Sequence, residues 1–548
     1  MARTSGATAA AGTPRARAIC FGVRPLPAQR AHWPHQLFAV HTGIVQPKPR
    51  AGGCDTPRIR IATGTGAAAD HRAVTATRQV SCGFINCERE EGEHRRCLEN
   101  PVDGVTPMLP GTTLPLPASL MTLLATFRPC FTAPSFRTFC ALAGGFLAQT
   151  GRRTVCGMLT GAGLSQVWPH HRAHRFFSHA RWSSQDLGLA LACLVASLLV
   201  PPSEPVLVAI DDTLFQRTGP KVHAIGWFHD GSVNGPHQVG LGNNWVIAAI
   251  VVTLPVLSRP VALPVLARLV HKDLKPAPAS RLVLARQMTA ALAAALPGRQ
   301  IHVVADAAYA GKELRRLPAA VTWTTRLRKD AALYEQAPPR TGKRGRPRIK
   351  GVRLPSLVSL AATARFGPVT VHRYGKTATV QAAAITCLWH GVFGARAVQV
   401  VLIRDRAKDG YDLALATTDL IASPAAVIER YAARWPIEVA IEDAKQIFGA
   451  GQARNRLPAA VHRTLPFTLA CQTIATLWYA TAGHHPGDVE DHRARAPWYR
   501  TKAEPSTADM IAKLRRVLIA AKYRPAHPDE PSPSEIHAVR LAWEGATA

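Results

Sequence analysis

The chain has 548 residues, of which 47% are hydrophobic, so it is long enough for more than one domain and apolar enough for a sizeable core. Its 66 Lys and Arg residues outnumber the 35 acidic ones and give a net charge of +31, which suits a polyanionic partner. The longest clean apolar run, 187–200, is too short for a membrane span, the N-terminus lacks a signal-peptide layout, and the 11 cysteines are scattered. These features argue against a membrane or secreted protein and predict a cytoplasmic one.

Residues 1–115 are predicted to lie outside the folded part of the protein. The first fifty contain no Asp or Glu, are rich in Ala, Pro and Arg, and show no sustained periodicity. The segment is either a disordered basic arm or the result of a start codon placed too early, with Met108 or Met121 as the true first residue.

Residues 116–200 are predicted to form a helical DNA-binding region. The stretches 135–149 and 183–199 have apolar faces typical of helices, and Ser183 or Ser184 is expected to cap the second. Between them, residues 167–182 interleave basic and aromatic side chains, which suits contact with DNA; the alternative is a histidine-rich loop that packs on its own domain.

Residues 201–330 are predicted to form the first part of a mixed α/β core. Apolar runs typical of strands are separated by two helical stretches, in the order three strands, helix, strand, helix, strand. The expected strands are 205–215, 243–255, 260–270, 299–306 and 319–330, and the expected helices are 280–296 and 311–317.

Residues 331–422 combine a basic loop with a β-rich insertion. The loop contains "KRGRPRIK", residues 343–350, which resembles an AT-hook in which Arg344 and Arg346 extend along a minor groove and Arg348 lies in the flank. The alternative is a solvated loop that touches phosphates without reading sequence, and DNA contact is expected in both cases. The expected strands of the insertion are 369–374, 377–389, 397–405 and 411–418.

Residues 423–456 contain a helix with a polar stripe. Tyr431, Arg434, Glu438 and Lys445 follow one another at steps of 3, 4 and 7 residues, which at ~100° per residue places them on one side of a helix. Pro436 lacks a backbone donor, so the helix either begins near residue 435 or kinks there, and the first two residues of the stripe then belong to a preceding helix. Residues 457–548 are expected to give one apolar helix, 457–483, and a polar tail.

Carboxylates are scarce in the α/β region, so their positions are informative. Two sites where an apolar strand gives way to polar residues carry Asp, namely Asp211–Asp212 and Asp306. Two such strands side by side bring carboxylates together, and these repel unless a divalent cation lies between them. Oxygen ligands without His or Cys favour Mg²⁺ or Mn²⁺. Glu438 on the striped helix can supply a third carboxylate for a two-metal phosphoryl-transfer site.

The order strand–Asp, strand–Asp, insertion, helix–Glu resembles the RNase H-like DDE transposases of bacterial insertion sequences. The helix matches their Tyr-x2-Arg-x3-Glu-x6-Lys motif, and "AIDDTLF" and "VVADAAYAG" resemble their first and second Asp motifs. The resemblance implies an α/β, RNase H-like mixed sheet with a β-rich insertion before the last catalytic helix, between helical N-terminal and C-terminal regions. It also implies a metal-binding triad of Asp212, Asp306 and Glu438, with Asp211 as the alternative first Asp.

The resemblance further implies the activity and the partners. A transposase of this kind binds the terminal inverted repeats of its own element, cuts them with Mg²⁺ or Mn²⁺, and joins the freed 3′-hydroxyl to target DNA, as a homodimer in the synaptic complex and in association with the bacterial nucleoid. The alternatives are a non-transposing nuclease of the same fold and a catalytically silent DNA-binding repressor or degraded copy. The side chains expected to contact DNA are Tyr431, Arg434, Lys445, Arg326, Arg328, Arg344, Arg346 and Arg348.

Overall fold

The computed structural model describes residues 116–231, 238–272, 279–339, 342, 346–406, 409–523 and 531–547. The chain divides into two compact units, Met1–Arg78 and Gln79–Ala548, and all described residues belong to the second. The predictions for residues 1–115 and for Arg344 therefore lie outside the described residues.

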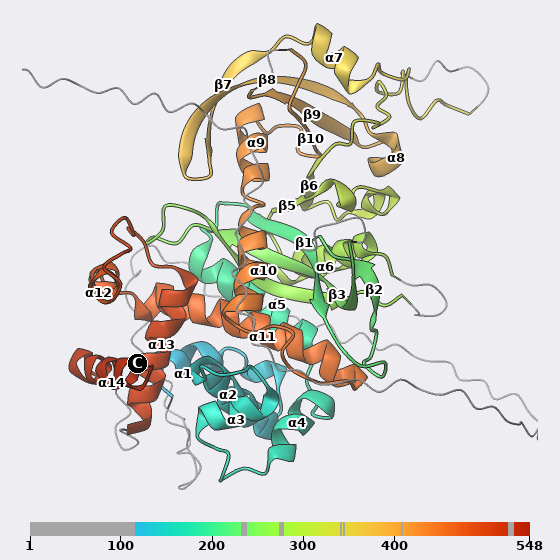
Figure 1. Cartoon of the computed structure of the whole chain (residues 1–548). Coiled ribbons are helices and arrows are strands. Elements are labelled where there is room, and N and C mark those ends of the chain that lie inside the picture. Colours follow the sequence, from blue (N-terminus) through green and yellow to red (C-terminus); the bar gives the residue numbers. More distant parts are fainter. Residues whose placement is uncertain are drawn as a thin grey trace, which may run out of the picture. The chain divides into compact units, whose positions relative to one another are not determined.

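A ten-stranded mixed sheet forms the centre of the second unit, in the order β2-β3-β1-β5-β6-β10-β9-β8-β7, with β4 paired to β3 (Figure 1). β5 pairs in parallel with β1 on one side and β6 on the other, and the remaining pairs are antiparallel. The predicted mixed α/β architecture is confirmed, and it is consistent with an RNase H-like domain. The strands are β1 (Val206–Gln216), β2 (Gly226–His229), β3 (Val239–Val252), β4 (Val261–Leu269), β5 (Ile301–Ala305), β6 (Val321–Arg326), β7 (Gly367–Arg373), β8 (Lys376–Leu388), β9 (Ala397–Arg404) and β10 (Leu413–Thr417).

The strands of the insertion continue the central sheet. β10 pairs with β6 through Leu415↔Arg326, and β9, β8 and β7 follow outward from it. Helix α9 (Pro424–Ala432) packs on this half of the sheet through Val427 and Ile428. Helix α10 (Pro436–Gln446) packs on the half formed by β1, β3 and β4, so the two helices lie end to end along one face (Figure 1). Helix α6 (Arg281–Ala295) packs on β3 from the opposite face.

The N-terminal part is helical, as predicted. Ser183 caps the N-terminus of α5, where its side chain accepts a hydrogen bond from the backbone N–H of Asp186. The histidine-rich stretch is a helix, α4, whose buried Phe176 and Phe177 join the aromatic core. The helices here are α1 (Ala118–Ala125), α2 (Ala133–Ala148), α3 (Val155–Ala162), α4 (His170–Ser178) and α5 (Ser184–Leu199).

The C-terminal part folds instead of forming the polar tail expected after residue 483. Helix α13 (Thr507–Tyr523) buries Met510, Ile511, Leu514 and Val517 in the main core, although Lys513, Arg515 and Arg516 stand among them and mask the apolar face in the sequence. The other helices are α11 (Pro458–Trp478), α12 (Asp488–Arg495) and α14 (Pro533–Thr547). No helix in the described ranges is long and apolar enough to cross a membrane.

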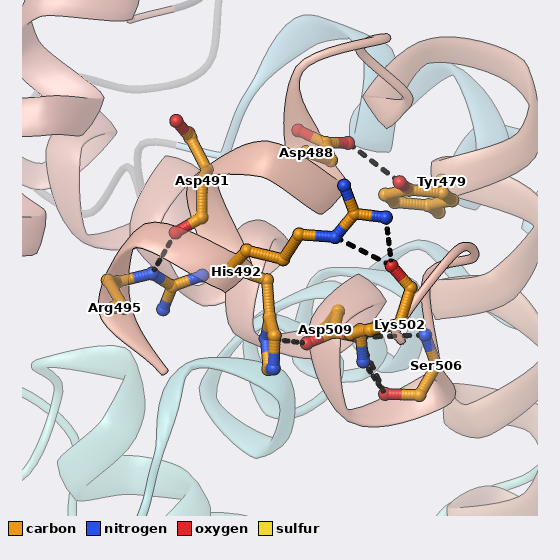
Figure 2. A network of polar contacts seen from close by, with 9 residues as sticks. Tyr479, Asp488, Asp491, His492, Arg495, Lys502, Ser506 and Asp509 are labelled. Atoms are coloured by element: carbon orange, nitrogen blue, oxygen red, sulfur yellow. Dashed lines mark hydrogen bonds and ion pairs between the residues drawn. The ribbon is translucent and has the colours of Figure 1, made fainter. Parts of the chain in front are cut away.

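Two carboxylates hold the connections between the C-terminal helices (Figure 2). Asp509 accepts hydrogen bonds from Ser506 and pairs with His492 and Lys502. Asp488 accepts a hydrogen bond of 2.7 Å from the hydroxyl of Tyr479. The contacts of Asp509 fix the turn before α13, and that of Asp488 fixes the start of α12, which explains how a polar segment becomes an ordered part of the unit.

Candidate active site

Asp211 and Asp212 lie in the middle of β1, and their side chains point to opposite faces of the sheet. Successive residues of a strand alternate between faces. Ala209 packs in the cluster that contains the apolar side chains of α10, whereas Ile210 packs in the cluster that contains those of α6. Asp211 therefore faces α10, and Asp212 faces α6.

The aspartates were expected at the end of a strand. They do not end β1, but they follow the last residue of β1 that pairs with β5. β1 continues to Gln216 because β3 extends alongside it, as far as the pair Gln216↔Gly242. Its pairing with β5 stops at Ile210↔Ala305. The two aspartates therefore begin the part of β1 that has lost its parallel neighbour, at the carboxyl ends of parallel strands, where α/β sheets bind ligands.

Asp306 follows β5 directly and lies beside Asp211 on the same face. The register Ile210↔Ala305 makes Asp211 and Asp306 the next neighbours in line. Asp306 keeps an extended backbone, with φ −70° and ψ 168°. Val304, two residues earlier, packs with the apolar residues of α10, so alternation directs Asp306 toward that helix as well.

The polar stripe spans the junction of two helices instead of one helix face. Tyr431 lies in α9, Arg434 lies in the turn 433–435, and Glu438 lies in the first turn of α10. Pro436 occupies the first position of α10, where its missing N–H costs no helical hydrogen bond. The predicted helix start near residue 435 is thus confirmed. The negative charge of Glu438 is also stabilised by the positive end of the α10 dipole.

Arg434 joins two of the predicted carboxylates. One guanidinium nitrogen lies 3.1 Å from a carboxylate oxygen of Asp211, and another contacts Oε1 of Glu438. Burial raises the pKa of Asp211 to about 6, although the Arg434 charge opposes the rise. Burial alone would lower the pKa of Arg434, but Glu438 and Asp211 raise it above its ordinary value. Asp211 and Glu438 are 227 residues apart in the sequence, and both contact the guanidinium of Arg434.

Tyr431 lies close enough to Arg434 and Asp306 for both charges to affect its pKa. Burial raises the pKa of Tyr431, Arg434 opposes the rise, and the nearby Asp306 carboxylate adds to it. Arg326 ends β6 in an exposed position and lies close enough to lower the pKa of the same phenol. One face of the sheet therefore gathers three carboxylates, a phenol that stays protonated at neutral pH, and two arginines.

The other predicted DNA contacts lie away from this face or on its margin. Lys445 lies two turns beyond Glu438, about 10 Å along α10, with its Nζ 5.5 Å from the centre of the Phe215 ring. Burial lowers the pKa of Lys445, and Asp230 opposes the change. Three further arginines of the predicted set are exposed in the segment after β6, namely Arg328, Arg346 and Arg348.

The donor set fits a hard divalent cation by chemistry, but the carboxylates are not gathered around one point. Asp211, Asp306 and Glu438 offer only oxygen ligands, as Mg²⁺ and Mn²⁺ prefer. Within the described ranges, no group of three or more His, Cys, Asp or Glu side chains is arranged to hold a metal ion. Arg434 lies between Asp211 and Glu438, so an ion that binds both must displace the guanidinium.

Asp212 has a different environment, which the sequence did not reveal. Its carboxylate accepts hydrogen bonds from the Tyr309 hydroxyl at 2.8 Å and the Asn244 amide at 3.1 Å, and it pairs with Arg281 at 2.9 Å. Tyr309 lies in "VVADAAYAG", three residues after Asp306. Its position in the second Asp motif was the one sequence feature that could have indicated a role at the site.

Comparison with known proteins bears on this site. A search of curated proteins finds no match. Residues 126–392 match the family model described as DDE superfamily endonuclease. The matched part, just under half of the chain, contains β1 and β5 with Asp211, Asp212 and Asp306, and it ends before α9 and α10. The match supports a DDE transposase-like family for this chain and implies a DNA substrate.

Proposed function

We propose that the protein is a DNA transposase that cuts and joins DNA at the ends of its own insertion sequence in a reaction that needs Mg²⁺ or Mn²⁺. The observation that carries the proposal is the contact of one guanidinium with both Asp211 and Glu438, on the sheet face toward which Asp306 is also directed. One aspartate on a strand, one directly after a strand and a glutamate on a helix, all on one face of the sheet, suit two-metal phosphoryl transfer.

The proposed triad is Asp211, Asp306 and Glu438. Asp212, the first choice from sequence, faces α6 and has its carboxylate occupied by three donors. Asp211 shares Arg434 with Glu438 and neighbours Asp306 in register. When bound, the metal ions would activate the attacking water or 3′-hydroxyl and stabilise the leaving oxygen.

The residues around the triad are proposed to hold the DNA backbone. Tyr431 keeps its proton at neutral pH and can donate a hydrogen bond to a phosphate oxygen beside Asp306. Arg326, at the end of β6, and Arg328, two residues on, are exposed and can neutralise neighbouring phosphates. Arg346 and Arg348, which are also exposed, and Lys445 on α10 are proposed to contact the DNA backbone as well.

A cleavage assay on DNA that carries the element's ends tests the proposal. We expect the wild-type protein to cut near the ends with Mg²⁺ or Mn²⁺ and to stop when EDTA removes the metal. Binding should weaken steeply between 50 and 200 mM salt, by roughly 10³-fold or more if six or more phosphates are contacted. Binding without cutting would favour a repressor, and cutting without preference for the ends would favour a non-transposing nuclease. A flat salt profile would contradict the predicted phosphate contacts.

Arg434→Gln is expected to increase the affinity of the full chain for Mn²⁺. The substitution removes the cation that a metal must displace, and a charge-assisted contact of this kind is worth about 1.5–3 kcal/mol, which corresponds to roughly tenfold or more in affinity. Electron paramagnetic resonance of free Mn²⁺ during titration of the full chain measures it. Arg430→Gln is the matched control, because Arg430 pairs with Asp419 at 2.9 Å instead of the triad. Equal affinity in the wild type and Arg434→Gln would show that the guanidinium does not compete with metal.

A further inference from the structure

Four elements meet at the carboxylate of Asp212, on the face of the sheet away from the proposed triad. β1 supplies Asp212, β3 supplies Asn244, α6 supplies Arg281 and the 3-10 turn η2 (Ala307–Tyr309) supplies Tyr309. Only 13% of the Asp212 side chain is exposed, and Tyr309 is buried. We call these four residues the Asp212 cluster.

The Asp212 cluster joins the two strands that carry the proposed aspartates. Asp212 directly follows Asp211, and the backbone N–H of Tyr309 donates to the carbonyl of Asp306 at 2.9 Å. The main-chain pairing of β1 with β5 ends one residue earlier, at Ile210↔Ala305. The bond from the Tyr309 hydroxyl to Asp212 therefore links β1 and the Asp306 turn beyond the last pair of the ladder.

The hydroxyl of Tyr309 contributes a hydrogen bond in addition to the packing of its ring. A buried hydroxyl without a partner costs about 1–3 kcal/mol, and Asp212 supplies that partner at 2.8 Å. On the other side of the turn, the hydroxyl of Thr325 donates to the carbonyl of Asp306 at 3.0 Å. The turn that presents Asp306 is thus held from β1 through Tyr309 and from β6 through Thr325.

We infer that Tyr309 is a positioning residue that acts through Asp212 and fixes the spacing between Asp211 and Asp306. The inference rests on the proposed function, since it concerns two of the proposed metal-binding carboxylates. The phenol is buried on the face of the sheet opposite the proposed triad. It sets where Asp306 lies relative to its neighbour, and a misplacement of about 1 Å in a catalytic group costs roughly 10²-fold in rate.

Tyr309→Phe tests the inference, and Tyr479→Phe is the matched control. Tyr479 is also fully buried, and its hydroxyl also donates to a carboxylate, that of Asp488 at 2.7 Å (Figure 2), but it lies in the C-terminal helices. We expect Tyr309→Phe to lower kcat for end cleavage by roughly 10- to 100-fold and to weaken Mn²⁺ binding, with KM and Kd for DNA unchanged. We expect Tyr479→Phe to lose a similar amount of stability to urea while keeping kcat and Mn²⁺ affinity.

The outcomes separate the inference from the proposed function. If the wild type cuts and Tyr309→Phe matches it in kcat and Mn²⁺ affinity, the inference fails and the proposed function stands. Equal losses in both Phe variants would mean that general destabilisation is the cause, and this also overturns the inference. If Tyr309→Phe does not fold, Asp212→Ala gives the second test, since it keeps the phenol and removes the carboxylate through which Tyr309 is inferred to act; an unchanged Mn²⁺ affinity there would overturn the inference. A wild type that neither cuts nor binds Mn²⁺ would overturn both proposals.

Discussion

Glu438→Gln is expected to abolish DNA cleavage and leave DNA binding within about twofold of the wild type. The substitution replaces one carboxylate oxygen by an amide nitrogen of the same shape, so packing in the first turn of α10 is kept. A metal ligand in phosphoryl transfer supports several kcal/mol of transition-state stabilisation, and at 1.36 kcal/mol per factor of ten the loss is roughly 10³-fold or more in kcat. Single-turnover cleavage of end-containing DNA, with a parallel gel-shift titration, measures both quantities.

Glu442→Gln is the matched control for this prediction. Glu442 lies one turn farther along α10, is exposed, and accepts a hydrogen bond from Gln446 at 2.9 Å. It carries the same charge on the same helix without a contact to Asp211 or Arg434 in the site. The control should cut and bind as the wild type does. Comparable cutting by Glu438→Gln and the wild type would remove Glu438 from the mechanism.

Most strands, and helices such as α2, α5, α6 and α11, could be predicted because their residues carry local signals. The core strands are continuous runs of Val, Ile, Leu and Ala, and Ser183 caps a helix where its spacing indicates one. β2 was missed, since "GWFH" is too short to show a period. α13 was missed because Lys513, Arg515 and Arg516 interrupt its apolar residues, and the apolar face is recognised only from its packing against the main core.

The contacts between the residues of the candidate site were harder to predict than the identity of those residues. The choice between Asp211 and Asp212 depends on which face of β1 the helix α10 covers, and that is set by the packing of residues distant in sequence, such as Ile437 and Ala209. Arg434 was predicted as a DNA contact, which stays a prediction, and the sequence did not indicate that its guanidinium contacts two carboxylates. The spacing of the stripe assumes one continuous helix. Because α10 begins at Pro436, Tyr431 and Arg434 lie before it, in α9 and in the turn between the helices.

Asp211→Asn is expected to abolish cleavage and at the same time to stabilise the folded protein above about pH 6. Burial raises the pKa of Asp211 to about 6 in the folded chain, against an ordinary value of 3.8. The folded state therefore binds this proton more tightly than the unfolded state, and stability falls as pH rises from about 4 to about 6. Because 22% of the Asp211 side chain is exposed, the cost at neutral pH is about 2 kcal/mol at most. Asn carries no charge and avoids that cost.

Urea unfolding in EDTA at pH 7.5 and at pH 4, together with the end-cleavage assay, measures both effects. The stability gain of Asp211→Asn should be present at pH 7.5 and absent at pH 4, where the wild-type carboxyl is already protonated. Asp212→Asn is the matched variant on the other face of β1, and it should lower cleavage without abolishing it and lose stability at pH 7.5, since three donors converge on that carboxylate. Full cleavage by Asp211→Asn together with none by Asp212→Asn would reverse the assignment of the first metal ligand.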